Sequence, residues 1–223
     1  MGEMRDSMET LNKRLDTENL RRWVLDFAHQ ILDEHEALSD LDAASGDADH
    51  GSNMHRGMSS LLREIPEWNE EALPAEFLKD VGMHLVSSVG GSSGALYGTI
   101  FLRMARTIGG AGTVDAQLLV RAFEAAGDGV AERGKVKQGD KTMYDALAPA
   151  IHALREQVEA GEESLAAALG AAAAAAEAGR DATADMVARK GKSSYARENS
   201  RGVIDPGAAS AAMLVRSAAR ALL

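Results

Sequence analysis

The apolar residues of this chain recur at helical spacing along nearly its whole length, which constrains the fold more than any other feature. Residues 17–38 place apolar side chains on one helical face, with Thr17 as candidate N-cap and Glu18 in the first turn. Similar patterns, one of them starting at a candidate Thr113 N-cap, lie in segments 54–65, 77–85, 96–104, 113–126, 142–158, 164–188 and 206–222. No run of alternating β-branched residues reaches strand length, so the sequence predicts an all-α fold of about eight helices.

The length and composition limit the class of protein further. We expect a single domain over residues 17–223, preceded by a flexible N-terminal extension over residues 1–16. The absence of cysteine excludes disulfides and thiolate metal sites and is typical of a cytoplasmic protein. No uninterrupted apolar stretch reaches about twenty residues, so no membrane-spanning segment is predicted.

The charge balance bears on what the chain can bind. A formal net charge of -10 repels nucleic acid and anionic lipid, which disfavours both as partners. Any phosphate that this chain binds therefore needs positive charge from another source.

One short turn gathers several acids in this already acidic chain. The segment GDADHGSNMHRG, residues 46–57, holds Asp47 and Asp49 between glycines, and Asp42 lies just before it. In a loop these side chains can converge on one point. Two carboxylates about 4 Å apart repel by roughly 4 kcal/mol at an effective dielectric constant of about 20, so a cation must lie between them.

The ligand types favour magnesium as that cation. All-oxygen ligation selects magnesium, calcium or manganese over zinc, and the segment lacks the terminal glutamate of a calcium-binding EF-hand loop. Magnesium also takes ligands from substrate phosphates, so it would supply the missing positive charge. The spacing of the acids is equally consistent with a purely structural role. In that interpretation Asp47 and Asp49 only form an Asx turn and cap a helix starting near Ser52.

Three further loops carry polar residues next to predicted helix starts. In SSVGGSSGALYG, residues 87–98, Ser92 and Ser93 precede a helix restart near Ala95, which suits either an anion contact or a tight interhelical turn. Asp205 before Pro206 is typical of an N-cap and the first helical residue. The loop GKVKQGDKTM, residues 134–143, is polar, and its lysines are consistent with a solvated surface.

These motifs together resemble one known family. GDADHGSNMHRG, SSVGGSSGALYG, RGKVKQGDKTMYD, ARKGKSSY and DPGAAS occur in the order and approximate spacing of the L subunit of dihydroxyacetone kinase, its nucleotide-binding subunit. The resemblance covers residues 17–222. It implies an up-and-down barrel of eight antiparallel helices with the nucleotide held by the loops at one end.

The resemblance also implies site residues. The acids that bind two magnesium ions in the family match Asp42, Asp47 and Asp49, and the bound nucleotide is ADP or ATP. The family's nucleotide contacts match His50, Gly51, Ser52, Asn53, Ser92, Ser93, Gly134, Met143, Lys192, Asp205, Pro206 and Gly207. Lys192 stands where arginine is expected in bacterial relatives, which keeps the charge but loses the two-pronged hydrogen bonding of a guanidinium group.

The resemblance implies a subunit that is inactive without its partner. In this family a separate K subunit holds dihydroxyacetone covalently through a histidine, and the L subunit presents the γ-phosphoryl group to a hydroxyl of the ketose. No catalytic residue is implied beyond the metal ligands. The remaining expected partners are a phosphotransferase-system phosphoryl donor and a second copy of the chain.

The sequence leaves the mode of action and the acceptor open. The nucleotide is either a freely exchanging ATP or a tightly held ADP that the phosphotransferase system rephosphorylates, and by analogy a free-standing L subunit favours the second. The acceptor is dihydroxyacetone or another short ketose such as erythrulose; fatty-acid kinase relatives tend to show GDGDTG in place of GDADH. The motifs also fit a magnesium and ADP sensor that docks on a transcriptional regulator, or a helical bundle with only a structural cation.

Overall fold

The computed structural model describes residues 14–44, 46–160 and 164–223, and in these ranges it confirms the all-α prediction. They hold eight α-helices, three short 3-10 helices and no strand beyond an isolated bridge between Leu15 and Val114. The helices are α2 (Thr17–Ala43), α3 (His50–Glu64), α4 (Pro74–Ser88), α5 (Gly91–Ile108), α6 (Ala116–Gly134), α7 (Tyr144–Ala160), α8 (Leu165–Ala182) and α9 (Pro206–Ala221). The 3-10 helices are η1 (Ile65–Glu67), η2 (Thr183–Asp185) and η3 (Lys192–Ser200).

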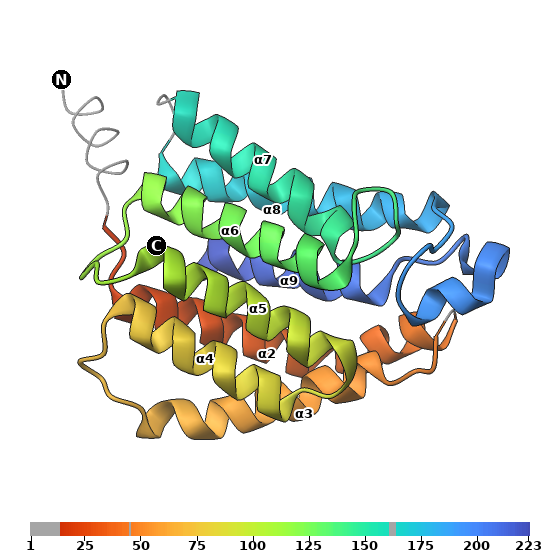
Figure 1. The fold of residues 1–223 in the computed structure, drawn as a ribbon, viewed down its shortest axis with the longest axis horizontal. Helices are drawn as coiled ribbons and strands as arrows, with labels where there is room; N and C mark the ends of the chain where they lie inside the picture. Colours follow the sequence, from red (N-terminus) through yellow and green to blue (C-terminus); the bar gives the residue numbers. More distant parts are fainter. Residues whose placement is uncertain (1–13, 45, 161–163) are drawn as a thin grey trace.

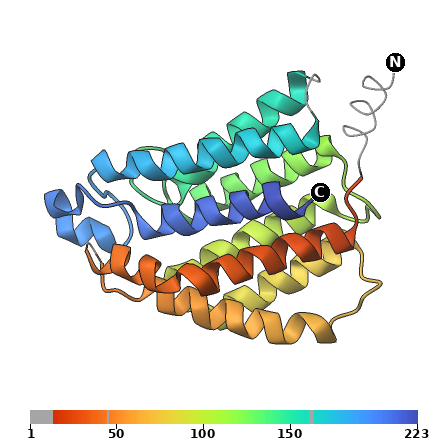
Figure 2. The same ribbon diagram turned by 180° about the vertical axis from the view of Figure 1, so that it is seen from behind.

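The eight helices form a closed up-and-down barrel. Each helix packs against the next along the chain, and α9 packs back against α2. Figures 1 and 2 show the helices lying side by side in alternating directions. Every second connection therefore lies at the same end of the barrel, and the turns that follow α2, α4, α6 and α8 meet at the right-hand end of Figure 1.

Trp23 of α2 joins several helices at the centre of the core. Its side chain is fully buried, and its ring lies 5.7 Å from those of Phe101 and Phe123, measured between centroids. Its indole N–H donates to the carbonyl of Leu214 at 3.0 Å, which satisfies the one polar group of this side chain. This one side chain of α2 thus contacts aromatic rings of α5 and α6 and a backbone carbonyl of α9.

Two helix starts differ from the predictions. Asp16, not Thr17, caps α2: its carboxylate accepts from the N–H of Asn19 at 2.9 Å, and the Asn19 side chain accepts from the N–H of Asp16. The Thr17 hydroxyl donates instead to the carbonyl of Ala72. Asp115, not Thr113, caps α6, because the bridge to Leu15 holds the preceding Val114 in extended backbone. The predicted N-cap residues were each one or two positions from the real ones.

The predicted N-terminal extension lies mostly outside the described residues, which begin at residue 14. Its last two residues belong to the packed structure, since Leu15 is fully buried and Asp16 caps α2. Two other predicted bounds shift: α5 starts at Gly91 and not near Ala95, and α8 ends at Ala182 before η2. Among the described helices, none combines the length and the apolar composition that a bilayer crossing requires.

Replacing Trp23 should test its central place in the core. We expect Trp23→Ala to lower the free energy of unfolding by about 3–5 kcal/mol, because it removes a fully buried aromatic ring. The matched control is Trp68→Ala, since Trp68 is only half-buried beside Phe77. Urea denaturation followed by far-ultraviolet circular dichroism measures both variants. Equal losses in the two would contradict this account of the core.

Candidate functional site

The acidic turn is built by Asp42, the last buried residue of α2. One oxygen of its carboxylate accepts from the backbone N–H groups of Asp49 and His50 at 2.9 and 3.0 Å. Asp42 thereby caps α3 from the preceding helix, whereas Asp49, in the N-cap position, makes no capping hydrogen bond with its side chain. The interpretation of Asp49 as the side-chain cap of this helix is therefore wrong, and its carboxylate is not used by the helix.

Gly46 is required by this arrangement. A Cβ atom at this position would lie 2.1 Å from a carboxylate oxygen of Asp42, so any side chain would displace the carboxylate. The glycine before Asp47 thus allows the chain to turn back tightly over the end of α2.

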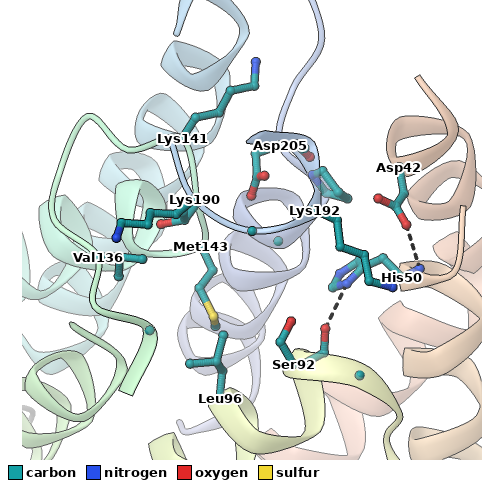
Figure 3. Close-up of a pocket in the computed structure, with 18 of the residues that line it drawn as sticks. Asp42, His50, Ser92, Leu96, Val136, Lys141, Met143, Lys190, Lys192 and Asp205 are labelled. Carbon is teal, nitrogen blue, oxygen red and sulfur yellow. Dashed lines mark hydrogen bonds between the residues drawn. The ribbon is translucent and has the colours of Figure 1, made fainter. Parts of the chain in front are cut away.

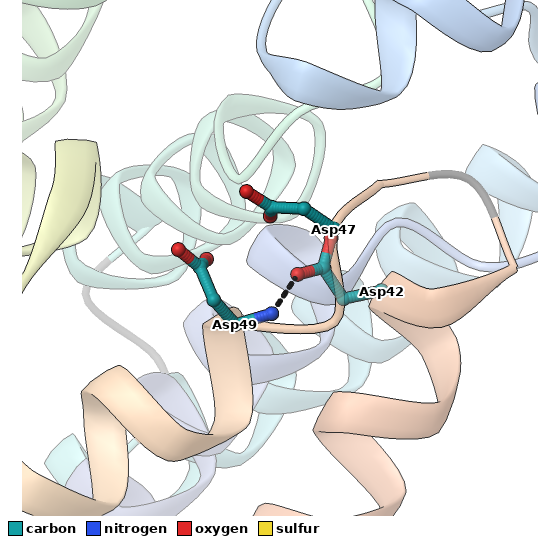
Figure 4. Close-up of side chains that lie close together, drawn as sticks. All are labelled: Asp42, Asp47 and Asp49. Carbon is teal, nitrogen blue, oxygen red and sulfur yellow. Dashed lines mark hydrogen bonds between the residues drawn. The ribbon is translucent and has the colours of Figure 1, made fainter.

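The turn brings the three predicted metal ligands together (Figure 4). Asp42, Asp47 and Asp49 can each offer one carboxylate oxygen so that the three oxygens lie within 4.8 Å of one another. Asp42 is buried, Asp49 is half-buried and Asp47 is exposed, so the cluster opens from the protein interior to the solvent. This is a hard, all-oxygen donor set with room for further ligands on its open side, as magnesium prefers.

Lys192 forms ion pairs with Asp47 and Asp49, the two less buried acids of the cluster. Its Nζ contacts carboxylate oxygens of Asp47 at 2.5 Å and of Asp49 at 2.7 Å, across more than half of the chain. The hydrogen bond with Lys192 lowers the pKa of Asp47, and the two carboxylates raise the pKa of Lys192. The residue predicted to contact the nucleotide therefore lies against the acidic cluster, where it offsets part of the negative charge of Asp47 and Asp49.

A pocket adjoins the acidic turn at the same end of the barrel (Figure 3). Most of the predicted site residues line it, namely Asp42, Asp49, His50, Asn53, Ser92, Ser93, Gly134, Met143, Lys192, Asp205, Pro206 and Gly207. The structure thus brings together residues from five separate segments of the sequence.

Three predicted residues do not line this pocket. Asp47 lies outside its lining but within the acidic cluster. Gly51 lies under His35 of α2, and a Cβ there would come within 2.0 Å of the His35 carbonyl oxygen, so this glycine serves helix packing. The Ser52 hydroxyl donates to the carbonyl of Asp49 within the first turn of α3.

One wall of the pocket is apolar. Leu96 from α5 faces Met143 in Figure 3, and Val136 lies beside them on the loop that follows α6. Sequence reasoning missed Leu96 and Val136 because it placed the first in a helix core and the second in a solvated loop. Only the apolar valine within an otherwise polar segment was a signal. The pocket thus has an apolar side, away from the acids, and a polar side next to them.

His50 fixes the polar side of the pocket. Its Nδ1 lies 3.1 Å from the hydroxyl of Ser93 and its Nε2 lies 2.9 Å from that of Ser210, which also accepts from Tyr97 at 2.7 Å. Burial lowers the pKa of His50, which favours the neutral ring. Because the Ser210 hydroxyl donates to the carbonyl of Gly207, we assign the His50 proton to Nε2. The ring thereby joins the starts of α3, α5 and α9.

Asp205 is the N-cap of α9, as predicted. Its carboxylate accepts from the N–H of Ala208 at 2.8 Å, and its own N–H donates to the hydroxyl of Thr183 at 2.9 Å. The side chain is buried, which raises its pKa from the ordinary value to about 7.

The comparisons with known proteins show the family of the chain. The family model described as the DAK2 domain matches residues 44–220. The chain belongs to the DAK2 domain family. It is 41% identical over 193 residues, 86% of this chain and 90% of the relative, to the ADP-binding subunit DhaL of a PEP-dependent dihydroxyacetone kinase from Listeria innocua. It is 40% identical to the corresponding subunit from Escherichia coli, with coverage of 84% of this chain and 89% of that relative.

Solved structures of a dihydroxyacetone kinase share the fold. The dihydroxyacetone kinase of C. freundii matches with a TM-score of 0.68 and 27% identity over 89% of this chain. A second structure of that enzyme, in complex with AMP-PNP and Mg²⁺, matches with a TM-score of 0.66 and 26% identity over 92% of this chain. This chain spans about a third of each solved chain, 33% and 34% respectively.

The raised pKa of Asp205 predicts a pH dependence of stability. The folded state holds the Asp205 proton up to about pH 7, whereas the unfolded state releases it near its ordinary pKa, so the parent loses stability as pH rises between these values. Asp205→Asn keeps an oxygen for the cap but does not ionise. We therefore compare the free energy of unfolding of the variant with that of the parent at each pH. The difference, variant minus parent, should be larger at pH 8.5 than at pH 5.5 by about 1–2 kcal/mol.

Thermal and urea unfolding at the two pH values measure this difference. The matched control is Asp115→Asn, because Asp115 caps α6 in an exposed position where water solvates the carboxylate. A relative stability of Asp205→Asn that does not change with pH would show that Asp205 ionises normally in the folded protein.

Proposed function

We propose that this chain is the nucleotide-binding subunit of a dihydroxyacetone kinase and that it holds ADP or ATP with magnesium in the pocket. The observation that carries the proposal is the cluster of three carboxylates beside a half-apolar pocket, at the loop end of a DAK2-family barrel. The relatives that match over most of their length are named as ADP-binding subunits.

Asp42, Asp47 and Asp49 are the proposed ligands of the magnesium ions. When bound, magnesium would neutralise and orient the nucleotide phosphates for transfer. The donor set fits this ion, because it is all carboxylate and open on one side. Asp42 is fixed by the two N–H groups that it accepts, so one ligand is oriented before any cation arrives. A matching structure of the C. freundii enzyme was solved in complex with AMP-PNP and Mg²⁺, which supports magnesium as the ion.

The remaining pocket residues suit the other parts of a nucleotide. Ser92 and Ser93 lie in the first turn of α5, where backbone N–H groups without helical partners favour an anion. Leu96, Val136 and Met143 offer the apolar surface that a base requires. We therefore place the phosphates at the acidic turn and the base against the apolar wall.

The ketose and the subunit that holds it lie outside this chain in our proposal. A separate K subunit would bring dihydroxyacetone to the mouth of the barrel, and this chain alone would be inactive. The names of the relatives, which are PEP-dependent or PTS-dependent kinases, favour a tightly held ADP that a phosphotransferase-system protein rephosphorylates. Native mass spectrometry distinguishes rephosphorylation of a held ADP from exchange with free ATP. ADP retained on the purified protein supports rephosphorylation, and an empty protein supports exchange.

A second acceptor is favoured by a specific observation. The chain is 34% identical over 194 residues to a D-erythrulose kinase of Mycolicibacterium smegmatis, of which it spans 33%. Erythrulose is thus the second candidate ketose. Phosphorylation assays with candidate K subunits and both ketoses separate the two acceptors, and no transfer with any partner would support a nucleotide sensor instead.

Asp47→Asn is the direct test of the metal site. With magnesium present, the variant should bind ADP about tenfold more weakly or worse, because it loses one charged ligand while the helical content stays intact. With a chelator present, it should bind ADP at least as tightly as the parent, because no metal is left for Asp47 to bind and one charge that repels the phosphates is gone.

Isothermal calorimetry under both conditions measures the affinities. The matched control is Asp40→Asn, which removes the same charge from an exposed position at the same end of α2. Equal affinity of Asp47→Asn and the parent in magnesium would remove Asp47 from the metal site.

A further inference from the structure

Lys141 has a side chain that the function proposed above does not use. It is fully buried, although it lies in a polar loop. The residue is among those that line the pocket, but its ammonium points away from the cavity in Figure 3. Its ammonium donates to four backbone carbonyls, those of Thr183, Met186, Ser200 and Val203, at 2.7, 3.2, 2.7 and 2.6 Å. Since an ammonium has three protons, the Met186 carbonyl at 3.2 Å shares one of them. This is a cage of carbonyl oxygens around a cation.

The four carbonyls come from the two ends of one connection. Thr183 and Met186 lie just after α8, and Ser200 and Val203 lie just before α9. The ammonium thus ties the beginning of this connection to its end. The stretch between them, residues 187–199, which we name the strap, is closed into a loop with Lys141 at its base.

Apart from Asp205, the N-cap of α9, the residues of this connection that line the nucleotide pocket lie in the strap. Lys190, Gly191 and Ser193 line the pocket, and Lys192 reaches Asp47 and Asp49. The strap packs against the rest of the protein only lightly, since most of its side chains are exposed. Its position therefore depends on its anchors more than on a hydrophobic core.

Two other hydrogen bonds anchor the strap at the same place. The N–H of Arg189 donates to the carbonyl of Asp140, next to Lys141, and the N–H of Ala188 donates to the hydroxyl of Ser200. Both hydrogen bonds lie next to the carbonyl cage, so they and the Lys141 ammonium hold the strap at the same place.

The backbone at Lys141 is held in an unfavourable conformation. Its φ of 60° lies in the left-handed region, which costs a residue with a side chain about 1 kcal/mol or more. The buried carboxylate of Asp145 stabilises this turn by accepting from the N–H groups of Gly139 and Thr142. The turn thus directs the Lys141 side chain under the strap while Met143, two residues later, lines the pocket.

We propose that Lys141 is a positioning residue for the nucleotide site, because its ammonium in the carbonyl cage holds the strap, and with it Lys192, at the acidic turn. The effect on nucleotide binding rests on the function proposed above, whereas the effect on the order of the strap does not.

Lys141→Ala tests the proposal without nucleotide. Amide hydrogen exchange of peptides from residues 187–199 should be about tenfold faster or more, because hydrogen bonds to an ammonium are among the stronger ones. Peptides of α2 and α5 should exchange as in the parent. The matched control is Lys137→Ala, which removes an exposed lysine of the same loop and should leave the strap unchanged.

Rescue by a small amine separates positioning from general stability. Ethylammonium or n-propylammonium replaces the missing end of the side chain and should slow strap exchange in Lys141→Ala towards the parent rate, whereas tetramethylammonium, which has no N–H, should not. If Lys141→Ala does not fold, Lys141→Met keeps the stem without the charge and takes its place. Global unfolding of both variants, or a strap that exchanges at the parent rate in the folded variant, would overturn the proposal.

The nucleotide measurement is kept separate. In magnesium, Lys141→Ala should bind ADP about tenfold more weakly or worse, with partial recovery in n-propylammonium. If the parent binds ADP and the variant binds it equally well, Lys141 does not position the site. If the parent itself does not bind ADP, the proposed function fails, while the exchange experiment still decides whether Lys141 holds the strap.

Discussion

Repulsion among Asp42, Asp47 and Asp49 is the constraint on which the rest of the site depends. Their oxygens lie within 4.8 Å of one another in a chain that already carries a formal net charge of -10. The fold compensates this repulsion in two ways: helix α3 donates two N–H groups to Asp42, and the strap places the Lys192 ammonium on Asp47 and Asp49. Because the lysine contacts are partly exposed, they contribute little to stability, and a divalent cation can replace them at low cost.

The closed barrel explains why distant motifs meet at one site. In an up-and-down arrangement every second connection lies at the same end, so the turns after α2, α4, α6 and α8 converge without any long crossover. Each contributes a different chemistry: carboxylates after α2, hydroxyls and free N–H groups after α4, an apolar valine after α6, and positive charge after α8. Buried polar links, above all His50 between Ser93 and Ser210, keep these turns in register.

Much of this structure could be predicted from the sequence, because helical periodicity and clustered acids are local signals. The all-α class and the acidic turn were predicted from the residues, whereas the convergence of Gly134 and Met143 on the site followed only from the family resemblance. Contacts between distant segments could not be predicted: nothing local indicates that Lys192 meets Asp47 or that Lys141 is buried. Helix starts were missed by one to four residues. Thr17 and Thr113 are acceptable N-caps, but Thr17 donates to the carbonyl of Ala72 and Val114 pairs with Leu15, so the local caps form at Asp16 and Asp115.

The central claim is that a divalent cation joins these three carboxylates to the phosphates of a bound nucleotide. Anomalous X-ray scattering from crystals grown with ADP and Mn²⁺ tests it most directly, because manganese takes the same oxygen ligands as magnesium. The account predicts anomalous density between the phosphates and the carboxylates of Asp42, Asp47 and Asp49, with Lys192 withdrawn from at least one of them. ADP bound in the pocket with no manganese at these carboxylates would contradict it.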